Sequence, residues 1–449
     1  MEQIAVTERL AQWLCSTRYE DLPAQVREKT VDVIYDSVGC MLACSTLDEV
    51  QTIVGFIADE GCRADCTIIG NRALTSAVSA AMAHGAMAHG DEVDPVHLAS
   101  VGGHVAAGPV PAALAVGEWL NSSGKDVARA VALGYELGGR MMTVFYREHD
   151  YISRRFYPTA VIGCLTSAVA AGLLLGFDPR QMQIALGLAA YQAAGPDNMM
   201  HDTSHMGKTF QVAAACRNGV TAALLTHRGA HVPLDILDGS LGLFDTYLGK
   251  PELGAKLLLP ELGSYYAITD VMHKRYSTGT PNQTYVQGLL SLLEKNPLTA
   301  EEIAAVEIQM HKPGLHTTPT TRPASIATNV VSAVAVVERK LDFYRLHDFA
   351  HVVTPAVAAM QKKIRVVPRG DWQGLEHNRH AIVTITTTAG KKLEEEVWYR
   401  PMTRPELDQK FDELVTPQAG AQKTRELRAL LQGIESAAGI RPLMEKLRG

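Results

Sequence analysis

Residues 84–115, HGAMAHGDEVDPVHLASVGGHVAAGPVPAALA, join two apolar segments through a turn that carries acids and imidazoles. Small and apolar residues precede this turn at helical spacing, and an apolar helix resumes near Pro111. Within sixteen positions the chain places six ionisable side chains: His89, Asp91, Glu92, Asp94, His97 and His104. Such groups are costly to bury without partners, so a buried turn of this kind indicates proton transfer or metal binding. The alternative is a polar surface loop between two helices.

Length and charge limit the class of protein. The chain has 449 residues, of which 47% are hydrophobic, and this length supports two or three domains. The net charge of −6 gives no sign of the basic face expected of a protein that binds nucleic acid. Only 6% of the residues are aromatic, while alanine, leucine and valine are abundant, which favours closely packed helices.

The cysteines and the hydropathy of the sequence indicate where in the cell the protein is expected. The seven cysteines are scattered and odd in number, which is typical of a reduced protein. The first residues, MEQIAVTERLAQWL, form an amphipathic pattern with acids instead of a basic stretch followed by an apolar run. No apolar stretch reaches the roughly 18 residues of a membrane span. We therefore expect a cytoplasmic protein with no membrane partner.

The periodicity of apolar residues predicts helices up to about residue 264 and a mixture of strands and helices after it. Strands are predicted at 306–310 and 363–367, and a hairpin at 378–400 that turns at Ala389-Gly390. Helices are predicted at 283–295, 323–338 and 353–362, and again after Pro401. The fold class is thus mainly α with an α+β part.

Five polar clusters interrupt the apolar helices. They span residues 89–104, 154–157, 201–208, 273–280 and 317–329. Most of them contain cations, namely Arg154, Arg155, Lys208, Lys274, Arg275 and Arg322. If the clusters converge, they form a pocket for a small polyanion, because Arg and Lys recognise carboxylates by charge-assisted hydrogen bonds. Each cation alone is more typical of a protein surface.

Two motif-like segments do not indicate the sites that they imitate. Gly207-Lys208-Thr209 has the ending of a phosphate-binding loop, but Asp202 stands where its first glycine belongs and no strand precedes it. The segment HDTSH at 201–205 imitates a zinc-protease helix, but we predict a loop over 195–209 and a helix only from Phe210. No metal site is predicted.

Three segments in order resemble the MmgE/PrpD family, which includes 2-methylcitrate dehydratase, cis-aconitate decarboxylase and iminodisuccinate epimerase. HGAMAHGDEVDPVH followed by GGHVAAGPVPAALA resembles the family's NGALAHALDFDDTH followed by HPSAPVLPAALA. GKTFQVAAACRNGVTAALLTHRGAHVPLDILDG resembles a second signature, which is a lysine followed by a helix and a glycine-ended run. HKRYSTGTPNQ resembles the signature that opens the family's second domain.

This resemblance implies a large all-helical domain built from both chain ends, here residues 1–266 and 402–449. An inserted α+β lid domain would occupy residues 267–401, with the site between the two. The resemblance also implies a homodimer that uses no metal and no organic cofactor.

Four family positions carry over to this sequence. Glu92 stands where the family has a functional aspartate, and His104 stands at the loop histidine that follows it. Lys208 is the signature lysine, and Lys274 is the lysine that opens the lid.

Four other positions depart from the family pattern of the decarboxylases. Tyr157 stands in place of a histidine, Val96 in place of a threonine, Gly279 near a histidine and Asn329 near a tyrosine.

The resulting hypothesis is a cofactor-independent lyase or isomerase that abstracts a proton next to a carboxylate of a small di- or tricarboxylate. The expected catalytic residues are His104 as general acid/base, Glu92, Lys208 and Tyr157. The expected substrate-binding residues are Lys274, Arg275, Arg155, His97, Asp94 and His89. Dehydration and epimerisation rank equally, and decarboxylation ranks lower because of Tyr157 and Gly279. The alternative is a catalytically silent member that binds a polycarboxylate or a protein partner.

Overall fold

The structure is a computed structural model that describes residues 5–100, 102–147, 156–202, 204–311, 324–348, 352–372 and 379–449. Its helices are α1 Val6–Ser16, α2 Ala24–Cys44, α3 Asp48–Glu60, α4 Ala77–Ala88, α5 Pro109–Leu120, α6 Gly124–Arg147, α8 Pro158–Leu174, α9 Pro179–Ala190, α10 Met206–His227, α11 Leu243–Leu248, α12 Asn282–Lys295, α13 Thr328–Glu338, α14 Phe343–His347, α16 Pro355–Gln361, α17 Arg404–Gln432 and α18 Arg441–Leu447. Its strands are β1 Cys66–Thr67, β2 Leu74–Thr75, β3 Val96–His97, β4 Val271–Met272, β5 Ile303–Met310, β6 Ile364–Pro368, β7 His380–Thr387 and β8 Lys392–Trp398.

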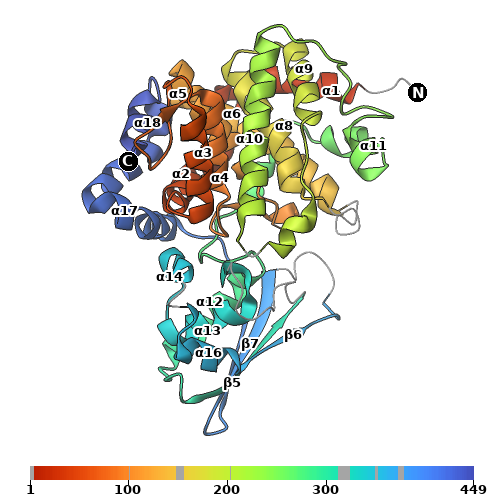
Figure 1. Cartoon of the computed structure of the whole chain (residues 1–449). Coiled ribbons are helices and arrows are strands. Elements are labelled where there is room, and N and C mark those ends of the chain that lie inside the picture. Colours follow the sequence, from red (N-terminus) through yellow and green to blue (C-terminus); the bar gives the residue numbers. More distant parts are fainter. Residues whose placement is uncertain are drawn as a thin grey trace.

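Two hydrophobic cores divide these elements. The larger core joins buried residues of the first 271 positions to those of α17 and α18, so it contains both ends of the described chain. Figure 1 shows the blue C-terminal helices beside the red and orange helices of the N-terminal part. The smaller core runs from Tyr285 to Val397 and contains the main sheet. The predicted fold class, mainly α with an α+β part, is confirmed.

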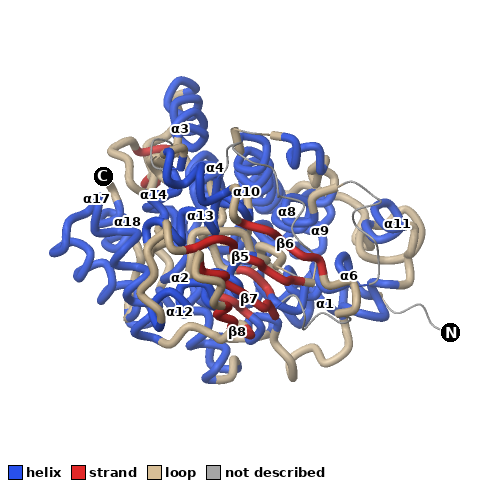
Figure 2. Tube along the Cα trace, turned by 90° about the horizontal axis from the view of Figure 1, so that it is seen from below, coloured by secondary structure: helices blue, strands red, loops and turns tan. Residues whose placement is uncertain are grey.

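The main sheet has four strands in the order β6-β5-β7-β8 (Figure 2). Strands β5 and β6 are parallel, while β7 is antiparallel to both β5 and β8. Alternate side chains such as Val306, Ile308 and Val383 are buried together with residues of α12 and α13. One face of the sheet is thus covered by helices, which matches the period-two pattern of its sequence. The predicted hairpin is confirmed as β7 and β8.

Helix α10 packs closely against α4 and α8, and small residues allow the approach. A Cβ atom at Gly85 of α4 would lie 2.8 Å from Cys216 Sγ and 3.0 Å from the carbonyl oxygen of Val212, both in α10. The two helices can therefore approach this closely only because position 85 has no side chain.

The start of α10 differs from the prediction. The helix begins at Met206, four residues before the predicted Phe210. The carboxylate of Asp202 accepts a hydrogen bond from the Gly207 amide at 2.5 Å and thereby satisfies one of the free donors of the first turn. Lys208 consequently lies in the first turn of a helix and not in a loop.

The C-terminal helix α17 packs against α2. Its first turn is closed by a capping box in which the side chains and amides of Thr403 and Glu406 bond reciprocally. Phe411 is 2% exposed and stacks on Tyr35 of α2, with ring centroids 4.3 Å apart. A Cβ atom at Gly39 would lie 2.9 Å from the Phe411 ring. The packing of α17 against α2 therefore depends on the contact between the large side chain of Phe411 and Gly39, which has no side chain.

Among the described residues, no single helix is both long and apolar enough to cross a membrane. Helices α2 and α3 meet such a test only as a pair, and they are bent by 86° at their junction.

We predict that Phe411→Ala lowers the free energy of unfolding by about 3–5 kcal/mol, because it leaves a cavity between α2 and α17. Urea denaturation followed by circular dichroism measures the change. Phe56→Ala is the control, since Phe56 is 51% exposed and its loss is expected to change stability by no more than about 0.5 kcal/mol. Equal stability losses in the two variants would contradict the importance of this contact.

Candidate active site

The turn between α4 and α5 is buried. Helix α4 ends at Ala88, and the short strand β3 that follows pairs with β4 in the register Val96 to Met272 and His97 to Val271. No residue of the acid and imidazole set at 89–104 is more than 8% exposed. The surface-loop alternative is therefore wrong, and the pairing of β3 with β4 brings residue 274 next to this turn.

Glu92 is held between two lysines. Its Oε1 accepts a hydrogen bond from Lys208 Nζ at 2.6 Å, and its Oε2 accepts one from Lys274 Nζ at 2.6 Å. Lys208 comes from the first turn of α10, and Lys274 lies two residues after β4. Burial by itself would raise the pKa of the Glu92 carboxyl, but Lys208 and Lys274 outweigh it and hold that pKa well below its usual range. Glu92 is therefore an ionised carboxylate.

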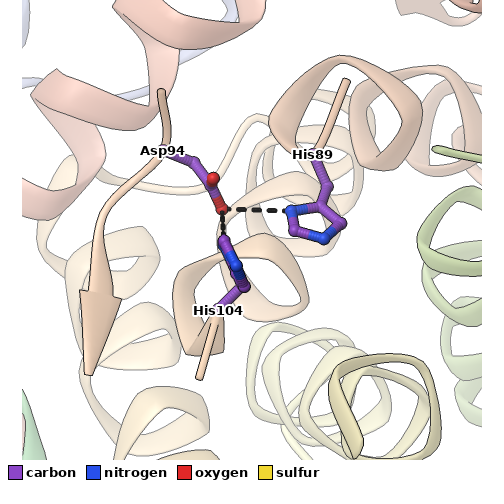
Figure 3. A group of neighbouring side chains, drawn as sticks. All are labelled: His89, Asp94 and His104. Carbon is purple, nitrogen blue, oxygen red and sulfur yellow. Dashed lines mark hydrogen bonds and ion pairs between the residues drawn. The ribbon is translucent and has the colours of Figure 1, made fainter. Parts of the chain in front are cut away.

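Asp94 connects two imidazoles, as Figure 3 shows. Its Oδ2 lies 2.8 Å from His104 Nδ1 and 3.3 Å from His89 Nδ1. The other nitrogen of His89, Nε2, lies 2.6 Å from the hydroxyl oxygen of Tyr157, the residue that precedes α8. Burial lowers the pKa of both imidazoles, and that of His89 falls well below its usual value.

These contacts select the proton positions. A carboxylate only accepts hydrogen bonds, so Asp94 favours neutral rings that carry the proton on Nδ1. His89 Nε2 then accepts a hydrogen bond from the hydroxyl of Tyr157. Burial raises the pKa of Tyr157 well above its usual value, so this phenol keeps its proton. His104 is left with Nε2 as the nitrogen that can take a proton.

The nitrogens and the carboxylate oxygen of His89, Asp94 and His104 lie within 4.8 Å of one another, which is a spacing that a metal ion could bridge. Lys274 Nζ lies 3.7 Å from the other oxygen of Asp94. An ammonium at this position opposes a dication by repulsion and itself neutralises the carboxylate. The donor set therefore fits a hydrogen-bonded chain better than a metal site.

The carboxylate of Asp91 has partners that sequence reasoning missed. Ser325 Oγ donates a hydrogen bond to its Oδ1 at 2.5 Å, and His347 Nε2 of α14 lies 3.0 Å from its Oδ2. His205 Nδ1, directly before α10, lies 3.7 Å from Oδ1. Ser325 and His205 belong to two of the polar clusters, but a lone histidine in a helix as short as α14 gives no sequence signal.

Other predicted residues lie elsewhere or bind other partners. The guanidinium of Arg275 pairs with Glu406 of α17 at 2.6 Å, and not with the Glu92 cluster. His97 Nδ1 lies 3.0 Å from Ser100 Oγ, and its ring packs edge-on against Tyr135. Arg155, with its neighbour Arg154, lies outside the described residues.

The positions that depart from the family pattern have local roles. The backbone of Val96 pairs with Met272, and the Gly279 amide donates to the carbonyl oxygen of Ser325 at 3.2 Å. Asn329 lies in the first turn of α13, and its side-chain oxygen is buried.

These features define a class of protein: a helical bundle that packs beside an α+β part and holds buried carboxylates, lysines and imidazoles suited to proton transfer. A family model of the MmgE/PrpD N-terminal domain matches residues 8–256, and one of the MmgE/PrpD C-terminal domain matches residues 276–435. The chain belongs to the MmgE/PrpD family.

Curated relatives carry the name of one activity. Cis-aconitate decarboxylase from Aspergillus terreus is 29% identical over 292 residues, which are 61% of this chain and 57% of that protein. Cis-aconitate decarboxylase from Homo sapiens is 25% identical over 61% of this chain and 56% of its own length. A cis-aconitate decarboxylase-like protein, oryM, from Aspergillus oryzae is 24% identical over 99% of this chain and 97% of its own. The matches to the two decarboxylases thus span little more than half of their length.

We predict that Glu92→Gln destabilises the protein by about 3–5 kcal/mol, because it leaves two buried ammonium groups without a counter-charge. Urea denaturation at neutral pH measures this loss. Glu395→Gln is the matched control, since it removes the partner of the exposed Lys295 at 2.9 Å, and such a pair contributes at most about 1 kcal/mol. A loss below that of the control would show that the two lysines do not depend on Glu92.

Proposed function

We propose that this chain is a cofactor-independent lyase or isomerase that acts on a small di- or tricarboxylate by abstracting a proton next to a carboxylate. One observation carries the proposal: the Asp94–His104 pair lies beside the Lys208–Glu92–Lys274 group in one buried cluster. The relatives named cis-aconitate decarboxylase support a tricarboxylate as the substrate class.

The chemistry follows from the charges. A C–H bond beside a carboxylate is very weakly acidic until the negative charge that develops on the carboxylate is stabilised. An ammonium has three donors, so Lys208 and Lys274 keep donors for a substrate carboxylate after each has bound Glu92. His104 then takes the proton at Nε2, while Asp94 holds the ring and stabilises the imidazolium that forms. Through His89, the hydroxyl of Tyr157 fixes the orientation of Asp94.

We place dehydration and epimerisation ahead of decarboxylation, because Tyr157 and Gly279 stand at or near positions where the decarboxylases have histidines. Dehydration needs one base and an acid near the leaving hydroxyl. Epimerisation needs a proton donor on each face of the carbon.

Proton exchange followed by NMR in heavy water tests the function. The panel is citrate, 2-methylcitrate, cis-aconitate, malate, iminodisuccinate and aspartate. Deuterium that enters beside a carboxylate without a new compound indicates an epimerase or a reversible first step. A new alkene or a lost carboxylate indicates a lyase. No change with any compound, together with binding of one of them, would favour the silent binding protein.

We predict that His104→Gln lowers kcat for the substrate found in this panel by about 10²–10⁴-fold, because it removes the general base. The dissociation constant of the substrate should change little. His231→Gln, at an exposed position, serves as the control and should keep the wild-type rate. A kcat for His104→Gln within threefold of wild type would contradict the assigned role.

The pH dependence of kcat/KM is the next prediction. His104 acts as a base only in its neutral form, and burial lowers its pKa below the usual value near 6.5, against the opposing effect of Asp94. Activity should therefore persist below pH 6.5 and fall as the pH drops through this lowered pKa. A pH–rate profile in overlapping buffers measures the acid limb. An acid limb centred above pH 6.5 would exclude His104 as the base.

The arrangement in the cell is part of the same proposal. We expect a cytoplasmic homodimer in which residues 267–401 act as a lid over residues 1–266 and 402–449. Light scattering coupled to size exclusion tests the dimer.

A further inference from the structure

The carboxylate of Asp91 is the centre of a second group of side chains in this site. Its side chain is 0% exposed. It accepts a hydrogen bond from Ser325 and lies near the rings of His347 and His205, and these three residues come from separate segments. Asp91 directly precedes Glu92, and His205 lies three residues before Lys208, so the same two segments supply both groups. The Asp91 group is thus continuous with the proposed active site.

His347 supplies the counter-charge of Asp91. Its Nδ1 donates to the carbonyl oxygen of Phe343 at 2.7 Å, and its Nε2 faces Asp91 Oδ2 at 3.0 Å. Both of these oxygens are acceptors, so the ring satisfies both contacts only as the doubly protonated imidazolium. Burial lowers the pKa of His347, but Asp91 outweighs it and raises that pKa above its usual value. His347 is therefore a cation.

His205 differs from His347 in its charge. Since His347 already neutralises Asp91, a second cation beside it would leave a buried positive charge without a partner. Burial, assisted by Lys208, lowers the pKa of His205 to about 4. The ring is thus neutral near pH 7. Its Nδ1 lies 3.7 Å from the carboxylate oxygen Oδ1 of Asp91, and this negative neighbour favours the tautomer with the proton on Nδ1, which leaves Nε2 as a hydrogen-bond acceptor.

Four side chains of this cluster are at least 10% exposed. The exposed fraction is 24% for His347, 11% for Glu92, 10% for His104 and 10% for His205, against 6% for Lys208 and 0–3% for Asp91, His89, Asp94 and Lys274. His205 also has a backbone φ of +63°, in the left-handed region. Residues other than glycine adopt this conformation rarely, and those that do are often found at ligand-binding sites. His205 and the proposed base, His104, thus each keep a partly exposed ring in this otherwise buried cluster.

We propose that His205 is a specificity-determining residue whose Nε2 accepts a hydrogen bond from a proton-bearing substituent, a hydroxyl or an amine, that the substrate carries beside its carboxylates. The lysines of the cluster supply donors for carboxylates, and His205 supplies an acceptor. This inference rests on the proposed function. If His205 has this role, the protein binds polycarboxylates that carry a hydroxyl or an amine more tightly than those that carry neither.

Binding of matched ligand pairs tests the proposal. Calorimetry at pH 7.5 would compare citrate with propane-1,2,3-tricarboxylate, and malate and aspartate with succinate. The members of each comparison differ only in the hydroxyl or the amine, and the malate and aspartate arms distinguish the two. We expect the wild-type protein to bind at least one donor-bearing ligand roughly 10-fold more tightly than its counterpart, which is the value of one hydrogen bond.

Two variants separate the two nitrogens of His205. Asparagine tolerates a positive φ, and its amide replaces the Nδ1 side of the ring while it removes Nε2. His205→Asn should therefore reduce the preference to within about twofold and leave the affinity of the ligand without a donor unchanged. Glutamine places an amide oxygen near the position of Nε2, so His205→Gln should keep part of the preference. His347→Gln, which changes the other histidine on Asp91, should alter both affinities together and keep their ratio.

The outcomes are distinct. Equal wild-type affinities within every pair, or a preference that His205→Asn retains, would overturn the role of His205 and leave the proposed function standing. If the wild-type protein binds none of these ligands, the proposed function fails, and this inference fails with it. Should His205→Asn not fold, the wild-type ratios and those of His205→Gln decide the question.

Discussion

The carboxylate of Glu92 lies inside the protein between the ammonium groups of Lys208 and Lys274, 2.6 Å from each. Removing one such ion from water costs several kcal/mol, and close opposite charges with hydrogen bonds can offset that cost. The elements that carry the two lysines must therefore reach the turn after α4. The close approach of α10 to α4 at Gly85 brings Lys208 to this turn, and the pairing of β3 with β4 brings Lys274 to it.

The same charge balance extends to the whole cluster. Asp91, Glu92 and Asp94 supply three negative charges, and His347, Lys208 and Lys274 supply three positive charges. The balance closes only if the remaining imidazoles, His89, His104 and His205, are neutral, and burial lowers the pKa of all three. Neutral imidazoles in a buried site can accept protons, which is the state that a general base requires. The balance of charges in the cluster thus keeps His104 in the neutral form that can accept a proton.

Sequence patterns predicted the apolar elements and the position of the central turn, but the burial of that turn stayed open against a surface loop until the structure showed it. The period-two alternation of the hairpin and the helical periods of α12 and α16 depend on nearby residues, so a local pattern predicts them. The start of α10 was predicted wrongly, because Asp202 caps a turn that contains a glycine.

Ion pairing was harder to predict from the sequence. The partner of Arg275 is Glu406, 131 residues away, and the partner of Asp91 is His347, 256 residues away. Such pairs are chosen by tertiary packing, and periodicity carries no information about them. The cations at 208 and 274 were assigned to the site by resemblance to the family, and the structure brings both to Glu92.

Tyr157 shows how one substitution can change the chemistry of such a cluster without opening it. A histidine at this position could bring a further titratable ring, whereas the phenol of Tyr157 has a raised pKa and remains neutral. Its hydroxyl donates to His89, which in turn donates to Asp94, so the chain of hydrogen bonds runs in one direction toward the carboxylate. Asp94 then binds the Nδ1 proton of His104 as well. Tyr157 therefore limits this side of the cluster to one titrating imidazole, His104.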